Sequence, residues 1–140
     1  IWTLLEGTGC RVGEIAGLLK PDVKIDADVP HLVIQEHPHR RLKTAGSSRN
    51  VPLVGDALDA GKQALALSAA DAKPLFGKYC RPRGADAASA ALMKQVRGAC
   101  HDPKLTVHSL RHLMADRLRI ARVEPSIQDA ILGHSSGRAS

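Results

Sequence analysis

The chain has 140 residues, a length that fits one domain around a single core. Hydrophobic residues make up 44% of it but aromatic residues only 2%, so aliphatic side chains and alanine must fill the interior. The 20 basic residues exceed the 14 acidic ones, and the formal net charge of +6 favours nucleic acid as a partner. No apolar run approaches the roughly 20 residues of a membrane span and no signal peptide is recognisable, so we expect a cytoplasmic protein without a membrane partner.

The first third of the chain predicts two helices and a small sheet. A helical pattern at residues 1–5 is interrupted by the turn-forming Gly7 and Gly9, and a second helix is expected at residues 12–19, before Pro21. β-Favouring runs at 23–25, 32–34 and 51–54 predict a three-stranded antiparallel sheet. The last two runs would form a hairpin whose basic connection, residues 37–50, has too few apolar residues to reach a core and must be exposed.

The remainder predicts four helices, at residues 56–68, 85–99, 110–121 and 126–132. Leu58, Leu65 and Leu67 would form the packing stripe of the first, and Gly133 would end the last. The fold class is therefore α+β, mainly α-helical with a small antiparallel three-stranded sheet. Because the chain lacks an initiator methionine and ends on a polar segment, we expect residues 1–140 to be one domain of a longer protein, cut at both ends.

Two segments of the first half carry residues suited to phosphate chemistry. In TGCRVGE at residues 8–14, Arg11 follows a glycine turn and could present its planar fork to two phosphate oxygens, while Glu14 orients it or caps the helix. A surface Arg–Glu pair is the alternative. In the basic connection, Lys43 could donate a proton to a departing alkoxide once nucleic acid is bound. Its neighbours could hold DNA backbone phosphates, unless the loop is merely solvated; they are Arg40, Arg41, Ser47 and Arg49.

Two histidine segments of the second half could complete such a site. His108, Arg111 and His112 would share one face of a helix and could clamp a phosphate. A zinc site there is disfavoured because the arginine between the histidines would repel a cation; a hydrogen bond to a buried carbonyl remains an alternative for His112. His134 follows the glycine that ends the last helix, where a histidine could also simply favour the helix dipole.

Several generic signatures are missing. The sequence has no P-loop and no GxGxxG, which leaves nucleotide binding unsupported, and no carboxylate cluster suited to two-metal phosphoryl transfer. The three cysteines are widely spaced without a CxxC pair, so neither a disulfide framework nor a thiolate zinc site is indicated. Phosphate chemistry would have to rely on arginine, lysine and histidine, and we expect no cofactor or metal.

Taken in chain order, four segments resemble the catalytic domain of tyrosine recombinases of the phage-integrase type. They are TGxRxxE at residues 8–14, a hairpin lysine followed by RxVPL at 49–53, HxLRH at 108–112 and LGHS at 132–135. The resemblance implies that Arg11 and Arg111 bind the non-bridging oxygens of the scissile phosphate. It further implies that His108 and His134 hydrogen-bond this phosphate and that Lys43 is the general acid for the 5′-oxygen.

By the same resemblance, Glu14 would position Arg11, and His112 would be a further supporting residue. The nucleophilic tyrosine of the family would lie beyond Ser140, so we expect the 140-residue chain not to cleave DNA. Tyr79 precedes the histidine motif and is better interpreted as a packing residue than as a nucleophile.

The resemblance implies a DNA strand transferase of a mobile element or phage, acting through a 3′-phosphotyrosyl intermediate at attachment-type sites in double-stranded DNA. The full-length protein would work as a homo-tetramer on DNA. Two alternatives stay open: a DNA-binding module without catalysis, from a decayed integrase gene, and an enzyme like a type IB topoisomerase. The DNA sequence recognised, and whether the reaction is integration, excision, resolution or transposition, do not follow from the residues.

Overall fold

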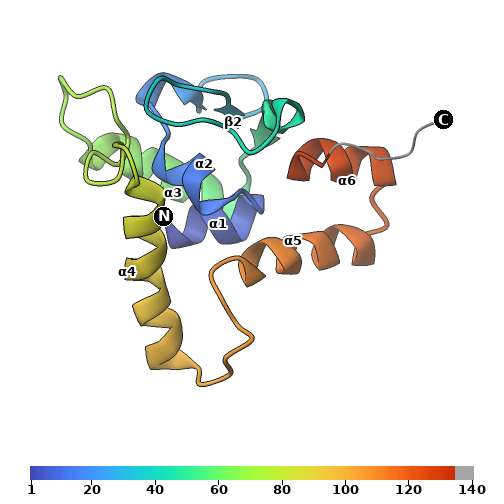
Figure 1. Ribbon diagram of the computed structural model, residues 1–140. Coiled ribbons are helices and arrows are strands. Elements are labelled where there is room, and N and C mark those ends of the chain that lie inside the picture. Colours follow the sequence, from blue (N-terminus) through green and yellow to red (C-terminus); the bar gives the residue numbers. More distant parts are fainter. Residues whose placement is uncertain (135–140) are drawn as a thin grey trace.

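The computed structural model describes residues 1–134 and arranges them as a sheet laid over a group of helices (Figure 1). The strands are β1 (Val23–Lys24), β2 (His31–Ile34) and β3 (Arg49–Pro52), with single 3₁₀ turns at Lys20–Asp22 and Ala45–Ser47. The helices are α1 (Trp2–Thr8), α2 (Val12–Ala16), α3 (Gly55–Leu67), α4 (Gly84–Ala99), α5 (Ser109–Ile120) and α6 (Pro125–Leu132). The predicted α+β class is confirmed.

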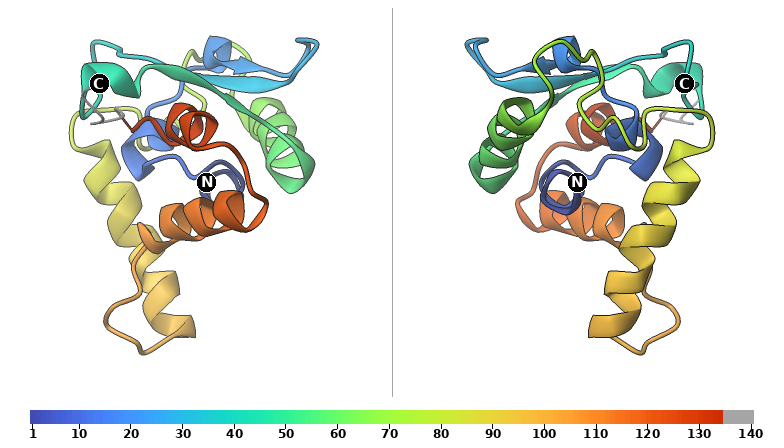
Figure 2. Two further views of the ribbon diagram at one scale, coloured as in Figure 1. Left: turned by 90° about the vertical axis from the view of Figure 1, so that its right-hand side faces the viewer. Right: turned by 90° about the vertical axis from the view of Figure 1, so that its left-hand side faces the viewer.

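The core lies between the sheet and the helices beneath it. α1 packs on α3 and α5, α2 packs on α4, and α6 lies under the sheet against β3, as the two side views show (Figure 2). The fully buried large side chains are aliphatic, as the composition requires: Leu4, Leu5, Ile15, Leu18, Leu32, Ile34, Val51 and Leu53. None of the helices among the described residues is long and apolar enough to cross a membrane.

Of the two glycines predicted to interrupt the first helix, only one does so. α1 continues through Gly7 to Thr8, and Gly7 serves close packing instead, because a Cβ there would lie 2.5 Å from the Cβ of Ala57 on α3. The helix ends at Gly9, whose φ of 69° is left-handed and whose amide N–H donates to the carbonyl of Leu5. The turn that carries Arg11 is thus set by Gly9 alone.

Replacing Gly9 by alanine is expected to lower the free energy of unfolding by about 1–3 kcal/mol, the usual cost of a left-handed non-glycine residue. A Cβ would also lie 2.8 Å from Cγ of Met114. Gly98→Ala is the control: it lies in α4 with nothing within 4 Å, and alanine there should be neutral or stabilising by up to about 1 kcal/mol. Equal stabilities in urea denaturation would contradict the steric argument.

α2 is three residues shorter than predicted. It ends at Ala16, because Gly17 closes it and the chain then turns to pair with the segment before α4. The amide of Leu75 donates to the carbonyl of Leu18 at 3.0 Å, and Leu19 forms a bridge with Pro74. This long-range pairing leaves no local pattern in the sequence of α2.

The predicted antiparallel sheet is confirmed, in the order β1-β2-β3. β3, however, begins at Arg49, two residues before the predicted run, with Arg49 opposite Ile34 and Val51 opposite Leu32. Arg49 therefore belongs to the strand and not to the exposed connection. The residues next to Arg49 in the sequence are polar, as is typical of a loop, and the prediction therefore placed the start of the strand too late.

The second half follows the prediction closely. α3, α4, α5 and α6 begin within one residue of their predicted starts, and Gly133 ends α6 with a left-handed φ of 68°. The packing stripe of α3 is partly wrong: Leu67 is 79% exposed, and Ala57 and Gly61 are buried instead. The small residues face the core because α1 and β1 approach this helix closely.

Candidate active site

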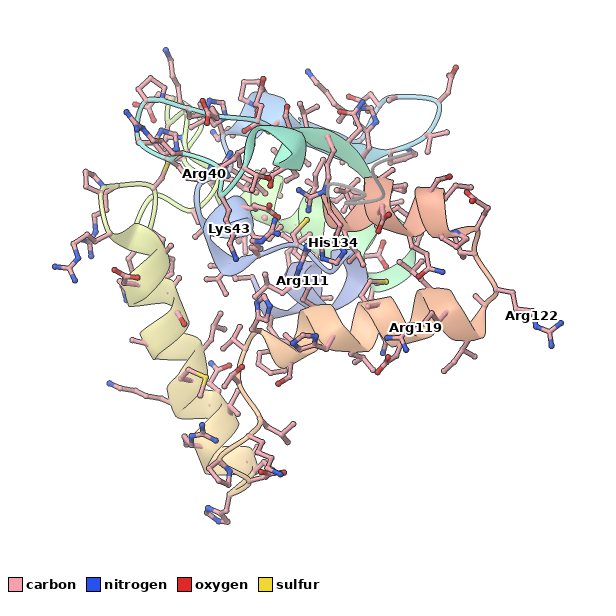
Figure 3. The ribbon with its side chains drawn as sticks, turned by 45° about the vertical axis from the view of Figure 1, so that its right-hand side comes forward. Arg40, Lys43, Arg111, Arg119, Arg122 and His134 are labelled. Atoms are coloured by element: carbon pink, nitrogen blue, oxygen red, sulfur yellow. The ribbon has the colours of Figure 1, made fainter. Side chains whose placement is uncertain are left out.

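Three separate segments bring predicted site residues to one open hollow beside α4 and α5. Arg11, Lys43 and His108 line this hollow together. In Figure 3 the side chains of Lys43, Arg111 and His134 lie together at the centre of this face, while Arg119 and Arg122 lie away from it, along α5 and past its end. The residues that the sequence placed in one site therefore converge in the fold.

Glu14 is the anchor of the site. Its carboxylate accepts from the backbone N–H of Arg11 at 2.9 Å, from Nη1 of Arg11 at 3.0 Å and from both terminal nitrogens of Arg49 at 3.0 Å. Burial alone would raise its pKa, but the hydrogen bonds and charges of Arg49 and Arg11 together hold it below its ordinary value. The predicted Arg11–Glu14 pair exists, and it is a buried carboxylate shared by two arginines rather than a surface pair.

Arg111 is buried, at 5% exposure, on the first turn of α5. Its Nη1 donates to the carbonyl of Gly9 at 2.8 Å and its Nη2 donates to the carbonyl of Leu132. Burial, followed by the charge of Arg11, lowers the pKa of this guanidinium. Arg11 and Arg111, from distant segments, thus lie close enough to repel each other. An anion bound between them would offset this repulsion.

His108 and His112 lie on one helical face, as predicted, because His108 has α-helical backbone angles and its carbonyl accepts from the N–H of His112 at 3.4 Å. His108 is the residue before α5, with its ring in an edge-on contact with that of His112 at 5.1 Å between centroids. Burial and then the positive surroundings, with His112 first, lower the pKa of His108. His108 is therefore held towards its neutral form and can donate one hydrogen bond, and both His108 and His112 are exposed. Within residues 1–134, no three potential metal ligands cluster.

His134 emerges directly after the glycine that ends α6. Its backbone N–H donates to the carbonyl of Asp129 at 3.0 Å, and its Nδ1 lies 3.8 Å from the carboxylate of the same residue. Burial and then Arg111 lower the pKa of His134, and Asp129 only partly offsets this. The imidazole is half exposed and lies on the same face as Arg111 (Figure 3).

The connection between β2 and β3 is only partly exposed, contrary to the prediction. Arg41 and Lys43 are exposed, but Ser47 is fully buried and bonds the hydroxyl of Thr44 at 2.9 Å. The side chain of Arg40 points inward and donates to carbonyls in the last turn of α2. Its hydrogen bond to the carbonyl of Glu14 is 2.6 Å long. Side-chain hydrogen bonds fix this loop on α2, and Leu42 adds a partly buried apolar contact, which is why the composition of the loop was misleading.

Arg40 and Arg49 are the residues whose surroundings differ most from the sequence expectation. Both were predicted to contact DNA phosphates, but Arg49 is 6% exposed and binds Glu14, and Arg40 binds backbone carbonyls. The one sequence signal for this was the acidic Glu14 at the start of a short apolar helix, since a buried carboxylate needs cationic partners.

Comparison with known proteins agrees with this geometry. Residues 1–139 match the model of the phage integrase family. The tyrosine recombinase XerD of Corynebacterium glutamicum is 32% identical over 140 residues, and XerC of Neisseria meningitidis serogroup B is 31% identical over 142 residues. These alignments cover 95% and 97% of the chain but 43% of each relative.

Solved structures show the same fold. XerA recombinase superposes with a TM-score of 0.73 at 23% identity, covering 96% of this chain and 47% of that one. The Tn1549 transposon integrase in complex with circular intermediate DNA gives a TM-score of 0.71 at 23% identity, covering 96% and 48%. This chain belongs to the phage integrase family, and it spans less than half the length of the relatives it matches.

Proposed function

We propose that the protein containing this chain cuts and rejoins double-stranded DNA at attachment-type sites, without a metal, through a 3′-phosphotyrosyl intermediate. The observation that carries the proposal is the convergence of two arginines, a lysine and two histidines, from four segments, on one open face. The cations there include two guanidiniums close enough for the charge of Arg11 to lower the pKa of Arg111. A phosphodiester is the anion that such a face in a DNA-acting protein would receive.

In the reaction, Arg11 and Arg111 hold the two non-bridging oxygens of the scissile phosphate, and His108 and His134 donate further hydrogen bonds. The phenolate oxygen of a tyrosine beyond Ser140, its proton given up to solvent, forms a bond to phosphorus as the bond to the 5′-oxygen breaks, and Lys43 gives the 5′-oxygen a proton. The pentacoordinate transition state carries more charge on the non-bridging oxygens than the ground state. Donors fixed in advance therefore favour the transition state.

The surroundings of the arginines supply this fixed geometry. Glu14 orients Arg11 through two hydrogen bonds, and two carbonyls hold Arg111, so neither side chain needs to reorganise when DNA arrives. Lys43 differs, because it lies exposed on the connection between β2 and β3 and can approach after DNA binds. His112 supports the site by packing edge-on against His108.

Binding to DNA would rest on exposed cations, and of the arginines predicted to contact phosphates, Arg41 is the exposed one. The full-length protein would assemble as a homo-tetramer on DNA, as the family resemblance implies, and we expect it to act in the cytoplasm. Arg40 and Ser47 support the loop from within rather than reaching a phosphate, because the terminal nitrogens of Arg40 and the hydroxyl of Ser47 already bind protein atoms.

The test is a suicide duplex carrying the recognised site, incubated with the full-length protein and scored for a covalent protein–DNA adduct. Lys43→Ala should slow adduct formation about 10²–10⁴-fold, the usual contribution of general acid catalysis. A substrate with sulfur in place of the 5′-bridging oxygen should restore most of the rate, because a thiolate leaves without a proton.

Each other outcome has a definite meaning. Binding without adduct would indicate a DNA-binding module from a decayed gene, and relaxation of plasmids without a defined site would indicate an enzyme like a type IB topoisomerase. Failure of the sulfur substrate to rescue Lys43→Ala would remove the general-acid assignment while leaving the rest of the site intact.

A further inference from the structure

The carboxyl end of α6 is held by arginines from other parts of the fold. The carbonyl of Ile131 accepts from Nε of Arg49 at 2.7 Å, and the carbonyl of Leu132 accepts from Arg111. These are last-turn carbonyls, which an α-helix cannot satisfy by itself. Apolar attachment of α6 is limited, since Leu132 is its buried residue, Ile131 is only partly buried and Ile127 is 51% exposed.

Arg49 has no donor left for DNA. Besides its bond to Ile131, Nη1 donates to Glu14 Oε1 at 3.0 Å and to the carbonyl of Ser47 at 2.7 Å. Nη2 donates to Glu14 Oε2 at 3.0 Å and faces Sγ of Cys10 at 3.8 Å. The five N–H groups of a guanidinium are thereby all engaged within the protein.

Gly133 gives independent evidence of how tightly the guanidinium of Arg49 fits there. A Cβ on Gly133 would lie 2.7 Å from Nη1 and 2.9 Å from Cζ of Arg49. The backbone at Gly133 therefore lies directly against the guanidinium of Arg49, one residue before His134. The position of Arg49 thus limits where the backbone of His134 can lie.

We infer that Arg49 is a positioning residue for His134. By joining the end of α6 to Glu14, Arg49 holds His134 at a fixed position relative to Arg11, so that both residues can contact the same phosphate. The inference rests on the proposed function, because it gives His134 and Arg11 a common ligand. It replaces the direct phosphate contact that the sequence predicted for Arg49. The carboxylate of Glu14 orients Arg11 directly. Through its bond to Arg49, the same carboxylate also holds the end of α6 in place.

Lysine cannot perform this task although it keeps the charge. A single ammonium has three donors at one point, whereas Arg49 reaches a carboxylate, two carbonyls and a thiol in different directions. Arg49→Lys should therefore keep electrostatic attraction for DNA and lose the geometry. This separates a positioning role from a phosphate contact.

The experiment compares Arg49→Lys and Arg49→Met with Arg119→Lys and Arg119→Met in the full-length protein. Arg119 is a matched control, since it is exposed on α5 and forms an ion pair with the exposed Asp116. We expect Arg49→Lys to shift the NMR signals of the His134 ring and amide and to slow adduct formation about 10²-fold, the effect of a displacement near 1 Å. DNA affinity should stay within about threefold, and the salt dependence of binding should not change in Arg49→Met.

A loss of about one from the salt slope of Arg49→Met, relative to Arg119→Met, would instead make Arg49 a phosphate contact. Unchanged His134 signals and a wild-type cleavage rate in Arg49→Lys would also overturn the inference. If Arg49→Lys does not fold, Gly133→Ala displaces the guanidinium from the other side and should give the same shift and slowing. A wild-type protein that forms no adduct would remove the proposed function, while the His134 signals still test the positioning role.

Discussion

Arg111→Lys is expected to reduce adduct formation by the full-length protein at least about 10³-fold while DNA affinity falls only a few-fold. A lysine would present a single point of charge where the guanidinium now reaches two carbonyls from a fixed position. Loss of one donor to a developing oxyanion costs about 10²–10³ in rate, and here the geometry of the remaining charge is lost as well. Rates from the suicide duplex and affinities from fluorescence anisotropy measure the two quantities separately.

The same substitution should also cost stability. The carbonyls of Gly9 and Leu132 are buried with Arg111, and a buried acceptor left without a donor costs about 1–3 kcal/mol. Arg122→Lys is the control, because this exposed residue follows α5 outside the site (Figure 3). A variant Arg111→Lys that is folded and cleaves near the wild-type rate would show that Arg111 is only a structural link between α1 and α6.

The elements that the sequence predicted well are those set by local pattern. α3 to α6 follow apolar periodicity and glycine or proline boundaries, so their limits were correct within one residue at their starts. α2 was predicted too long because its end is set by pairing with residues 73–75, more than fifty residues away. The start of β3 was missed because Arg49 pairs with Ile34 of β2, whereas the polar residues around it have the composition of a loop.

The candidate site shows the same division. The order of the motifs was enough to place Arg11, Lys43, His108, Arg111 and His134 in one site, and the fold brings them to one face. The inward roles of Arg40 and Arg49 were not predicted, because a basic loop with few apolar residues has the composition of a solvated surface. Their positions depend on which carbonyls and carboxylate the fold leaves in need of donors.

Glu14→Ala is expected to lower the free energy of unfolding by about 3–5 kcal/mol, the usual result of removing one partner from a buried ion pair. Arg49 would remain buried with its charge uncompensated, and Arg11 would lose the acceptor that orients it. Asp86→Ala is the matched control, since it breaks an Arg–Asp pair in which both side chains are more than 70% exposed and should cost at most about 1 kcal/mol. Similar losses for the two variants in urea denaturation would contradict the buried-anchor interpretation.

The contribution of Glu14 should also depend on pH in a defined direction. Because Arg49 and Arg11 outweigh burial and hold the folded-state pKa of Glu14 below its unfolded value, the folded state binds the proton less readily than the unfolded state. The stabilisation is therefore complete above the ordinary carboxyl pKa, about 4.3, and is lost as the pH falls from there through the lowered folded-state pKa. The difference in unfolding free energy between the wild type and Glu14→Gln should accordingly be constant from pH 6 to 8 and shrink only below about pH 4.5. A difference that grew on acidification would mean that burial, and not the two arginines, dominates the ionisation of this carboxylate.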